Sequence, residues 1–277
     1  MTKYLSVVAA TALLIQPPAF HTRVEVVTVD VSVTRADATV AGLTADDFIV
    51  TDSGVRQRID TVTVSRAPLS VTLVLDTSGS VAGQRLDALI SASDQVVNEL
   101  RTNDYVSLIR FSSTVAHPVE LTTNFESVRS ALHALTGAAD TSLRDALFLA
   151  LQTRPHEATR PLVLIFTDGA DTSSWLSPDE VLESVRHANV VIHAVAFGSH
   201  AFLKDVTREA GGRIWFASSN RDLQKLFGRA IRDIREHYVL TYTPSGVGQS
   251  GWHALSVKLS RTHGDVVARP GYWVNVH

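Results

Sequence analysis

The spacing of apolar residues changes twice along this chain of 277 residues and divides it into three zones. Residues 23–64 alternate as β-strands do, and β-branched residues are frequent on both alternating faces. Over residues 69–236, short apolar strands alternate with stretches of helical spacing. The strand pattern returns over residues 237–277.

The middle zone has the pattern of an α/β fold. Its predicted strands are residues 71–75, 105–111, 115–121, 161–167 and 190–197, and its clearest helices are residues 125–135, 143–152 and 178–188. Near-continuous apolar strands separated by amphipathic helices predict a doubly wound, mostly parallel sheet with helices on both faces. We expect residues 115–121 to form its antiparallel edge strand.

The two outer zones are each too small to form a stable core alone. We therefore predict that residues 20–66 and 237–277 pair into one small β-sandwich-like domain, with residues 69–236 inserted between them. The C-terminal strands are predicted at residues 238–242, 252–259 and 266–276. Five aromatic side chains are expected to fill the sandwich core: Tyr238, Tyr242, Trp252, Tyr272 and Trp273.

The first residues have the features of a secretory signal peptide. Lys3 precedes an apolar run over residues 4–15, and Gln16-Pro17-Pro18-Ala19 follows it. The run is shorter than the roughly 20 apolar residues that span a bilayer. We expect residues 1–19 to direct export and the mature chain to have no membrane span; a buried N-terminal strand or helix is the alternative.

Composition excludes several functional classes. A formal charge of −3 gives no electrostatic reason to expect binding to nucleic acid or to an anionic membrane. The chain has no cysteine, which rules out disulfides, thiolate metal sites and cysteine nucleophiles. Its 11 histidines contain no H-x-x-x-H pair, and no zinc site is expected.

Oxygen-bearing side chains follow two of the predicted strands. Asp76-Thr77-Ser78-Gly79-Ser80 ends the first, and Thr167-Asp168-Gly169 ends the most apolar one. Between them, Thr141 stands at a helix entry. Carboxylates and hydroxyls converging at the ends of adjacent strands are ligands for a hard cation such as Mg²⁺. Taken alone, the first run is equally consistent with an Asp/Ser helix cap.

These three segments resemble the von Willebrand factor type A domain and its metal-ion-dependent adhesion site, over about residues 69–236. The resemblance implies an ion, Mg²⁺ or Mn²⁺, bound directly by serines, with the acids and threonine binding directly or through water. The residues that it assigns to the metal are Asp76, Ser78, Ser80, Thr141 and Asp168. It also implies capture of an acidic side chain of a protein partner by the ion.

Three neighbouring acids have structural interpretations as well. Asp140 stands where the family has a glycine, and it either strengthens cation binding or caps the next helix. Asp145 forms a capping-box-like pair with Ser142. Asp171 is interpreted as a solvated loop acid, with orientation of a metal-bound water as the alternative.

The segments outside the α/β zone resemble those of exported bacterial proteins of this family. Leu43-Thr44-Ala45-Asp46-Asp47-Phe48 followed by Asp52-Ser53-Gly54 is similar to their N-terminal flank, and Arg269-Pro270-Gly271-Tyr272-Trp273 to their C-terminal one.

The sequence therefore predicts an exported, non-catalytic, metal-dependent protein-binding module. One alternative is a scaffold in which the metal site only supports the fold. Another is a phosphotransferase with Asp76 as nucleophile, although Ser78 then replaces the second acid and is a poor proton donor. The chain has no G-x-x-x-x-G-K-[ST] or G-x-S-x-G motif. Neither the partner nor the oligomeric state is assigned.

Overall fold

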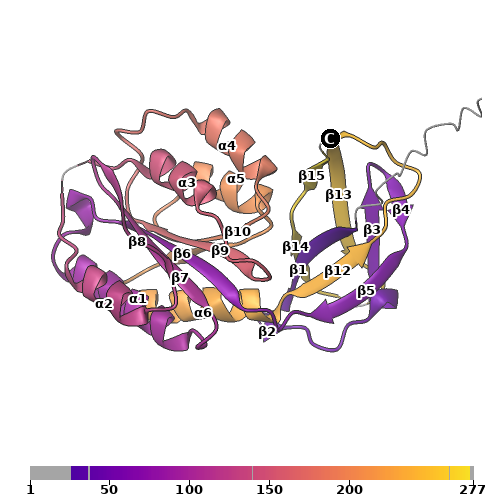
Figure 1. Cartoon of the computed structure of the whole chain (residues 1–277), viewed down its shortest axis with the longest axis horizontal. Helices are drawn as coiled ribbons and strands as arrows, with labels where there is room; N and C mark the ends of the chain where they lie inside the picture. The colour runs from indigo at the N-terminus through magenta and orange to yellow at the C-terminus, as the bar shows by residue number, and fades with distance from the viewer. Residues whose placement is uncertain (1–25, 37, 139, 262, 275–277) are drawn as a thin grey trace, which may run out of the picture.

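The computed structural model describes residues 26–36, 38–138, 140–261 and 263–274 (Figure 1). An α/β domain and a β-sandwich lie side by side, and both ends of the described chain contribute to the sandwich (Figure 1). The predicted signal peptide, residues 1–19, lies outside the described residues. Among the helices that are described, none has the length and apolar character needed to cross a bilayer.

The α/β domain is built on a six-stranded sheet with the order β11-β10-β9-β6-β7-β8. Its strands are β6 (Leu69–Asp76), β7 (Tyr105–Phe111), β8 (Val115–Thr122), β9 (Arg160–Thr167), β10 (Val191–Phe197) and β11 (Ile214–Ala217). All neighbours pair in parallel except β8, which runs antiparallel to β7 at the edge. Strand β6 is buried along its whole length, which explains its uninterrupted apolar sequence.

Three helices cover each face of this sheet (Figure 1). One face carries α1 (Gln84–Glu99), α2 (Phe125–His133) and α6 (Asp222–Glu236), and the other carries α3 (Leu143–Gln152), α4 (Pro178–His187) and α5 (Ala201–Glu209). Helix α4 shows how local sequence sets a boundary. Ser177 and Glu180 form a reciprocal capping box, and Pro178 takes the first helical position, where its missing N–H is not needed.

The direction of the chain reverses between β6 and β9. From β6 the chain moves outward through β7 and β8, and it then returns to β9 on the other side of β6. The carboxyl ends of these two adjacent strands therefore flank a topological switch point, the place where open α/β sheets bind ligands. Asp76 is the last residue of β6, and Thr167 is the last residue of β9.

The sandwich consists of two antiparallel sheets. One contains β1 (Val27–Arg35), β2 (Ala38–Thr39), β5 (Ile59–Val64), β12 (Tyr238–Tyr242) and β14 (Asp265–Ala268), and the other contains β3 (Phe48–Asp52), β4 (Val55–Gln57), β13 (Gly251–Leu259) and β15 (Gly271–Val274). In the first sheet β1 pairs with β12, so that Val29 lies opposite Leu240. In the second, β3 pairs with β13. The predicted fold class is confirmed, because the two outer zones share both sheets around the inserted α/β domain.

Ser53 and Gly54 form the turn between β3 and β4. Ser53 and Gly54 have φ angles of 47° and 83°, so both central residues occupy the left-handed region. Two-residue hairpins of this kind match the twist of the strands they join, and glycine adopts the conformation without steric cost.

The prediction of one strand over residues 266–276 is wrong. The chain forms two strands there, β14 in the first sheet and β15 in the second. The break falls at Arg269 and Pro270, and proline lacks the N–H that a continuous strand would need. The switch lets one segment supply an edge strand to each sheet of the sandwich.

The predicted aromatic core is correct in part. Tyr238 and Tyr242 are buried in it, whereas the Trp273 side chain is 37% exposed. Trp273 stacks instead on the His187 ring of α4, with 4.7 Å between ring centroids, and Trp252 packs against Trp273 edge to face. The two tryptophans thus lie at the junction between the domains.

Candidate metal centre

The five predicted site residues lie in three loops at the carboxyl edge of the sheet. Asp76 ends β6, and Ser78 and Ser80 follow in the turn that leads into a 3₁₀ segment, Gly79–Val81. Thr141 precedes α3, and Asp168 follows β9 directly.

Hydrogen bonds link the strand-end loops through their side chains. Ser80 Oγ donates to Asp168 Oδ1 at 2.6 Å, and the hydroxyls of Ser78 and Ser80 are 3.1 Å apart. A methyl group added at Gly169 would lie 3.6 Å from both Ser80 Oγ and Thr141 Oγ1. The hydroxyls of Ser80 and Thr141 therefore face one common space beside Gly169.

The loop that carries Thr141 is fixed by main-chain hydrogen bonds. The amide of Ala138 donates to the Thr77 carbonyl at 2.8 Å, and the amide of Ser142 donates to the Ser112 carbonyl at 2.8 Å. The Thr141 carbonyl in turn accepts from the amide of Thr172 at 2.9 Å. Backbone contacts thus help to set the relative positions of the three loops.

Asp76 is a buried carboxylate without a cationic partner among the described residues. Its side chain is inaccessible to solvent; Oδ1 accepts the Ser78 amide at 2.8 Å, and Oδ2 accepts the Thr167 hydroxyl at 2.6 Å. Burial raises the pKa of Asp76, and the nearby Asp168 raises it further, although the hydrogen bonds from Ser78 and Thr167 oppose both effects. A bound cation would offset this desolvation cost.

Asp168 differs because a guanidinium group balances its charge. Its Oδ2 pairs with Nη1 of Arg85, in the first turn of α1, and its side chain is also inaccessible to solvent. Sequence analysis did not identify Arg85. A usable signal was its position, because the helix that follows β6 begins over the same edge of the sheet as the strand-end acids.

Two of the three neighbouring acids have surroundings that differ from those predicted. Asp171 is not a solvated acid: it accepts from the Arg144 amide at 2.8 Å and from the Arg144 guanidinium at 2.9 Å. It also accepts from Ser174, and these hydrogen bonds lower its pKa despite its burial. The pair thus joins α3, which carries Arg144, to the loop after β9, which carries Asp171.

Asp145 does not form the predicted capping pair. Its carboxylate accepts the amides of Trp175 and Leu176, at 3.0 and 3.1 Å, and so fixes the loop after β9. Ser142 occupies the N-cap position of α3 without a side-chain capping bond, and the neighbouring Asp140 is exposed.

The donor set fits a hard divalent cation. Two carboxylates and three hydroxyls supply only oxygen, which Mg²⁺ and Mn²⁺ prefer over nitrogen and sulfur ligands. The sequence model of the von Willebrand factor type A domain matches residues 70–229. The chain belongs to this family. Von Willebrand factor type A domains mediate protein–protein interactions, often with a divalent metal at a metal-ion-dependent adhesion site, and are generally non-enzymatic.

Curated relatives share the type A region with this chain. Human inter-alpha-trypsin inhibitor heavy chain H6 is 28% identical over 151 residues, which cover 48% of this chain and 12% of the relative. The bovine heavy chain H4 is 29% identical over 168 residues, which cover 54% of this chain and 18% of the relative. The match thus spans at most about a fifth of these relatives' length.

Solved structures share the fold. A von Willebrand factor type A protein from Catenulispora acidiphila aligns with a TM-score of 0.56 at 13% identity, covering 85% of this chain and 75% of that one. Proximal thread matrix protein 1 from the mussel byssus aligns with a TM-score of 0.56 at 18% identity, covering 66% of this chain and 49% of that one. That structure is described with a zinc-occupied MIDAS motif.

A second cluster of potential ligands lies at the domain junction, where His193, Asp233 and His237 approach one another. His193 Nδ1 accepts the Arg213 amide at 3.0 Å, so the ring proton stands on Nε2, and Nε2 lies 3.2 Å from Asp233 Oδ2. Arg213 also lies 3.5 Å from Asp233, and its positive charge opposes a bound cation. We interpret the cluster as a buried polar link between the domains, since Ser32 of β1 also donates to Asp233.

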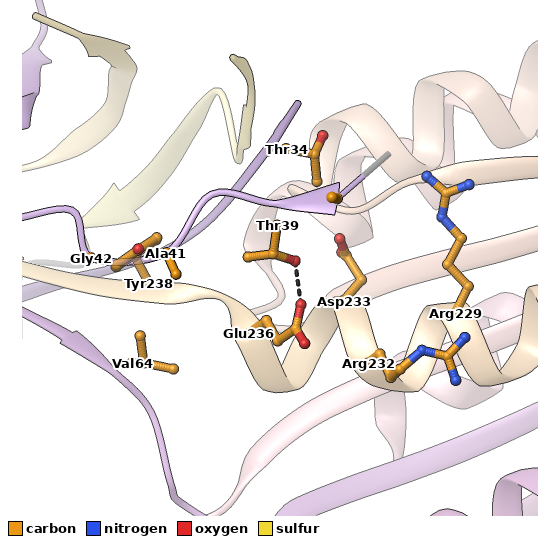
Figure 2. A pocket seen from close by; sticks show the side chains of 11 residues that line it. Thr34, Thr39, Ala41, Gly42, Val64, Arg229, Arg232, Asp233, Glu236 and Tyr238 are labelled. Atoms are coloured by element: carbon orange, nitrogen blue, oxygen red, sulfur yellow. Dashed lines mark hydrogen bonds between the residues drawn. The ribbon is translucent and has the colours of Figure 1, made fainter. Parts of the chain in front are cut away.

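A groove of about 520 Å³ lies beside this link, between α6 and the sandwich (Figure 2). The hydroxyl of Thr39 donates to Glu236 across it (Figure 2). Its lining mixes Arg229 and Arg232 with Asp233 and Glu236, so its charge favours no single class of ligand.

Proposed function

We propose that this chain is a divalent-metal-dependent protein-binding module. Asp76, Ser78, Ser80, Thr141 and Asp168 would hold Mg²⁺ or Mn²⁺, and a carboxylate of a protein partner would complete the ion's coordination. The observation that carries the proposal is the buried Asp76 carboxylate, which has no cationic partner among the described residues and ends a strand at the switch point.

The donor types explain why an outside carboxylate would be bound. Asp76 and Asp168 supply the negative charge, while the three hydroxyls supply neutral oxygens. When bound, the metal would offer a further coordination position at the edge of the sheet. The two acids balance the ion's charge but supply only two of its ligands, and a hard cation prefers oxygen, so a carboxylate oxygen from a partner is the favoured further ligand.

We further propose that residues 1–19 direct export and that the domain boundaries lie at residues 20–66, 69–236 and 237–277. The charged n-region and short apolar run support export. The shared sheets of β1 with β12 and of β3 with β13 support the boundaries, because both outer segments are needed to complete the sandwich.

The first test is thermal melting of the protein in chelator, Ca²⁺, Mg²⁺ and Mn²⁺, with Asp76→Ala and Asp168→Ala as variants. We expect Mg²⁺ or Mn²⁺ to raise the melting temperature of the wild type and of neither variant. Asp60→Ala is the matched control, because Asp60 is an exposed acid in β5 of the sandwich, outside the proposed ligand set. An equal metal response in Asp76→Ala would contradict the assignment.

A second test separates binding from a purely structural role. A peptide library displaying acidic residues is panned against the wild type with Mg²⁺ and with chelator. Recovery of acidic peptides only with Mg²⁺, and their loss in a folded Asp76→Ala protein, is the expected result. Unfolding of Asp76→Ala without any metal-dependent peptide would favour the scaffold alternative.

The phosphotransferase alternative is disfavoured by the surroundings of Asp76. Both carboxylate oxygens accept hydrogen bonds and the side chain is inaccessible to solvent, whereas a nucleophile needs an oxygen open to its substrate. We expect no turnover of phosphate esters by the wild type.

A further inference from the structure

We propose that Arg85 is a tethered competitor of the divalent cation. Its guanidinium group binds Asp168 in the metal-free protein, and full use of Asp168 by a metal ion requires Arg85 to release it. This inference rests on the metal site proposed above, and it concerns how strongly and under what condition that site binds its ion.

Each oxygen of the Asp168 carboxylate has a partner. Oδ1 accepts the Ser80 hydroxyl at 2.6 Å, and Oδ2 pairs with Arg85 Nη1. The Asp168 side chain has no exposed surface. An ion that approaches this carboxylate therefore meets both partners, and Arg85 is the one that carries a competing positive charge.

The arginine side chain has support outside the pair and a path away from it. Its guanidinium carbon lies 4.3 Å from the centroid of the Phe197 ring at the end of β10, and its Nε is 3.4 Å from Asn220 Oδ1. About a third of its side chain, 35%, is exposed. The group can thus leave Asp168 by a rotation into solvent, or keep its position over the Phe197 ring while the bond to Asp168 is broken.

The charge balance of the site gives Arg85 a second effect. Without metal, two carboxylates and one guanidinium leave one negative charge. A divalent ion reverses this to one positive charge, which a single carboxylate from a partner would neutralise. Without Arg85, the ion alone would neutralise the two acids. The arginine should therefore weaken metal binding in isolation and make it depend more strongly on the partner's carboxylate, a coupling that acts in both directions.

The test measures Mn²⁺ affinity from the electron paramagnetic resonance signal of the free ion, for the wild type and Arg85→Gln. Glutamine keeps part of the stem and removes the charge. We expect about ten-fold tighter binding in Arg85→Gln, the size of effect that loss of one charge-assisted competing bond can produce.

Arg144→Gln is the matched control. Arg144 forms another arginine–aspartate pair beside the site, with Nη2 of Arg144 2.9 Å from Asp171 Oδ1, but it touches none of the proposed ligands. Its variant removes the same charge, and we expect Mn²⁺ affinity within two-fold of the wild type. An equal gain in both variants would reduce the effect to general electrostatics and overturn the proposal.

The remaining outcomes separate the two proposals. Unchanged or weaker Mn²⁺ binding in Arg85→Gln, with normal binding in the wild type, overturns the role of Arg85 alone. No Mn²⁺ binding by any of the proteins overturns the metal site, and the role of Arg85 with it. If Arg85→Gln does not melt cooperatively in chelator, Arg85→Met replaces it; methionine keeps an unbranched stem without the charge, and an affinity equal to that of the wild type would overturn the proposal.

A direct readout uses the Arg85 side chain itself. In protein labelled with ¹⁵N-arginine, addition of diamagnetic Mg²⁺ should shift the Nε–Hε signal of Arg85. That signal is identified because it is missing from the spectrum of Arg85→Gln. A resonance that stays unchanged at saturating Mg²⁺ would contradict release of Asp168.

Discussion

Asp52 of the β-sandwich and Asp76 of the α/β domain are both completely buried, yet their surroundings are opposite in kind. Asp52 accepts the hydroxyls of Tyr242 and Tyr272, at 2.9 and 2.6 Å, and lies 2.9 Å from His253 Nδ1. Burial acts to raise its pKa, but these donors outweigh burial and hold the pKa below its ordinary value. For Asp76, burial prevails and the pKa is raised.

The difference separates an acid that stabilises the fold from one suited to bind a cation. A buried charge is tolerated when polar groups of the protein surround it, and Asp52 has such a shell from strands far apart in sequence. The tyrosines remain protonated donors because burial and Asp52 raise their own pKa values. Asp76 has fewer donors, and its desolvation cost remains partly uncompensated in the protein without metal.

The largest effect on stability is expected when Asp52 is removed. In Asp52→Ala, the hydroxyls of Tyr242 and Tyr272 and the ring of His253 lose their common acceptor, so we expect the free energy of unfolding to fall by about 3 kcal/mol. Urea denaturation measures it. Asp60→Ala, which removes an exposed sandwich acid, should cost less than about 0.5 kcal/mol. Equal costs for the two variants would contradict a special role for the buried acid.

The next effect is the response to metal. At Mn²⁺ concentrations about 100 times its dissociation constant, the wild type should gain about 2.7 kcal/mol in unfolding free energy, because only the folded state presents the assembled ligands. Asp76→Asn should lose this gain, whereas Asp60→Ala should retain it. Thermal melting with and without chelator provides the measurement, and a gain that survives in Asp76→Asn would place the ion elsewhere.

A smaller effect of opposite sign is expected for Asp76 in chelator. Asp76→Asn removes a partly uncompensated buried charge while keeping the side-chain volume, and we expect it to stabilise the metal-free protein by about 1 kcal/mol. Asp52→Asn should destabilise it under the same conditions. Urea denaturation of both variants tests the comparison directly, and the same sign in both would refute it.

The smallest expected effect is a loss of folding stability at acidic pH. The folded-state pKa of Asp52 lies below the ordinary value of 3.8, so its stabilising contribution is fully present above that pH. It is lost as the pH falls through the folded-state pKa. We expect the difference in unfolding free energy between the wild type and Asp52→Asn, measured in urea, to be constant from pH 7 to about pH 5 and to shrink below 3.8. A difference in unfolding free energy that grows as the pH falls would mean that the folded-state pKa of Asp52 is raised and not lowered.

The sequence could predict the features that depend on short stretches of chain. Continuous apolar runs identify buried parallel strands, and Ser177 with Glu180 marks the start of a helix. The break at Pro270 was also available from the sequence, because proline cannot continue a ladder on both sides, yet the apolar residues around it suggested one strand. The sequence also places Asp76 and Asp168 at strand ends, but their convergence depends on β6 and β9 being neighbours in the sheet.

The pairing of Arg85 with Asp168 and the shell around Asp52 depended on tertiary structure. Arg85 and Asp168 are 83 positions apart, and Asp52 and Tyr272 are 220 apart. No local pattern encodes such contacts, because they arise only when separate strands and helices pack. The sequence by itself determined the α/β and β zones and which residues carry oxygen at the strand ends, since backbone periodicity and turn chemistry are local. Only the tertiary structure decided which buried acid is surrounded by donors, which is balanced by a guanidinium, and which has no cationic partner in the described part of the chain. The reason is that desolvation and charge pairing depend on every group packed around a site.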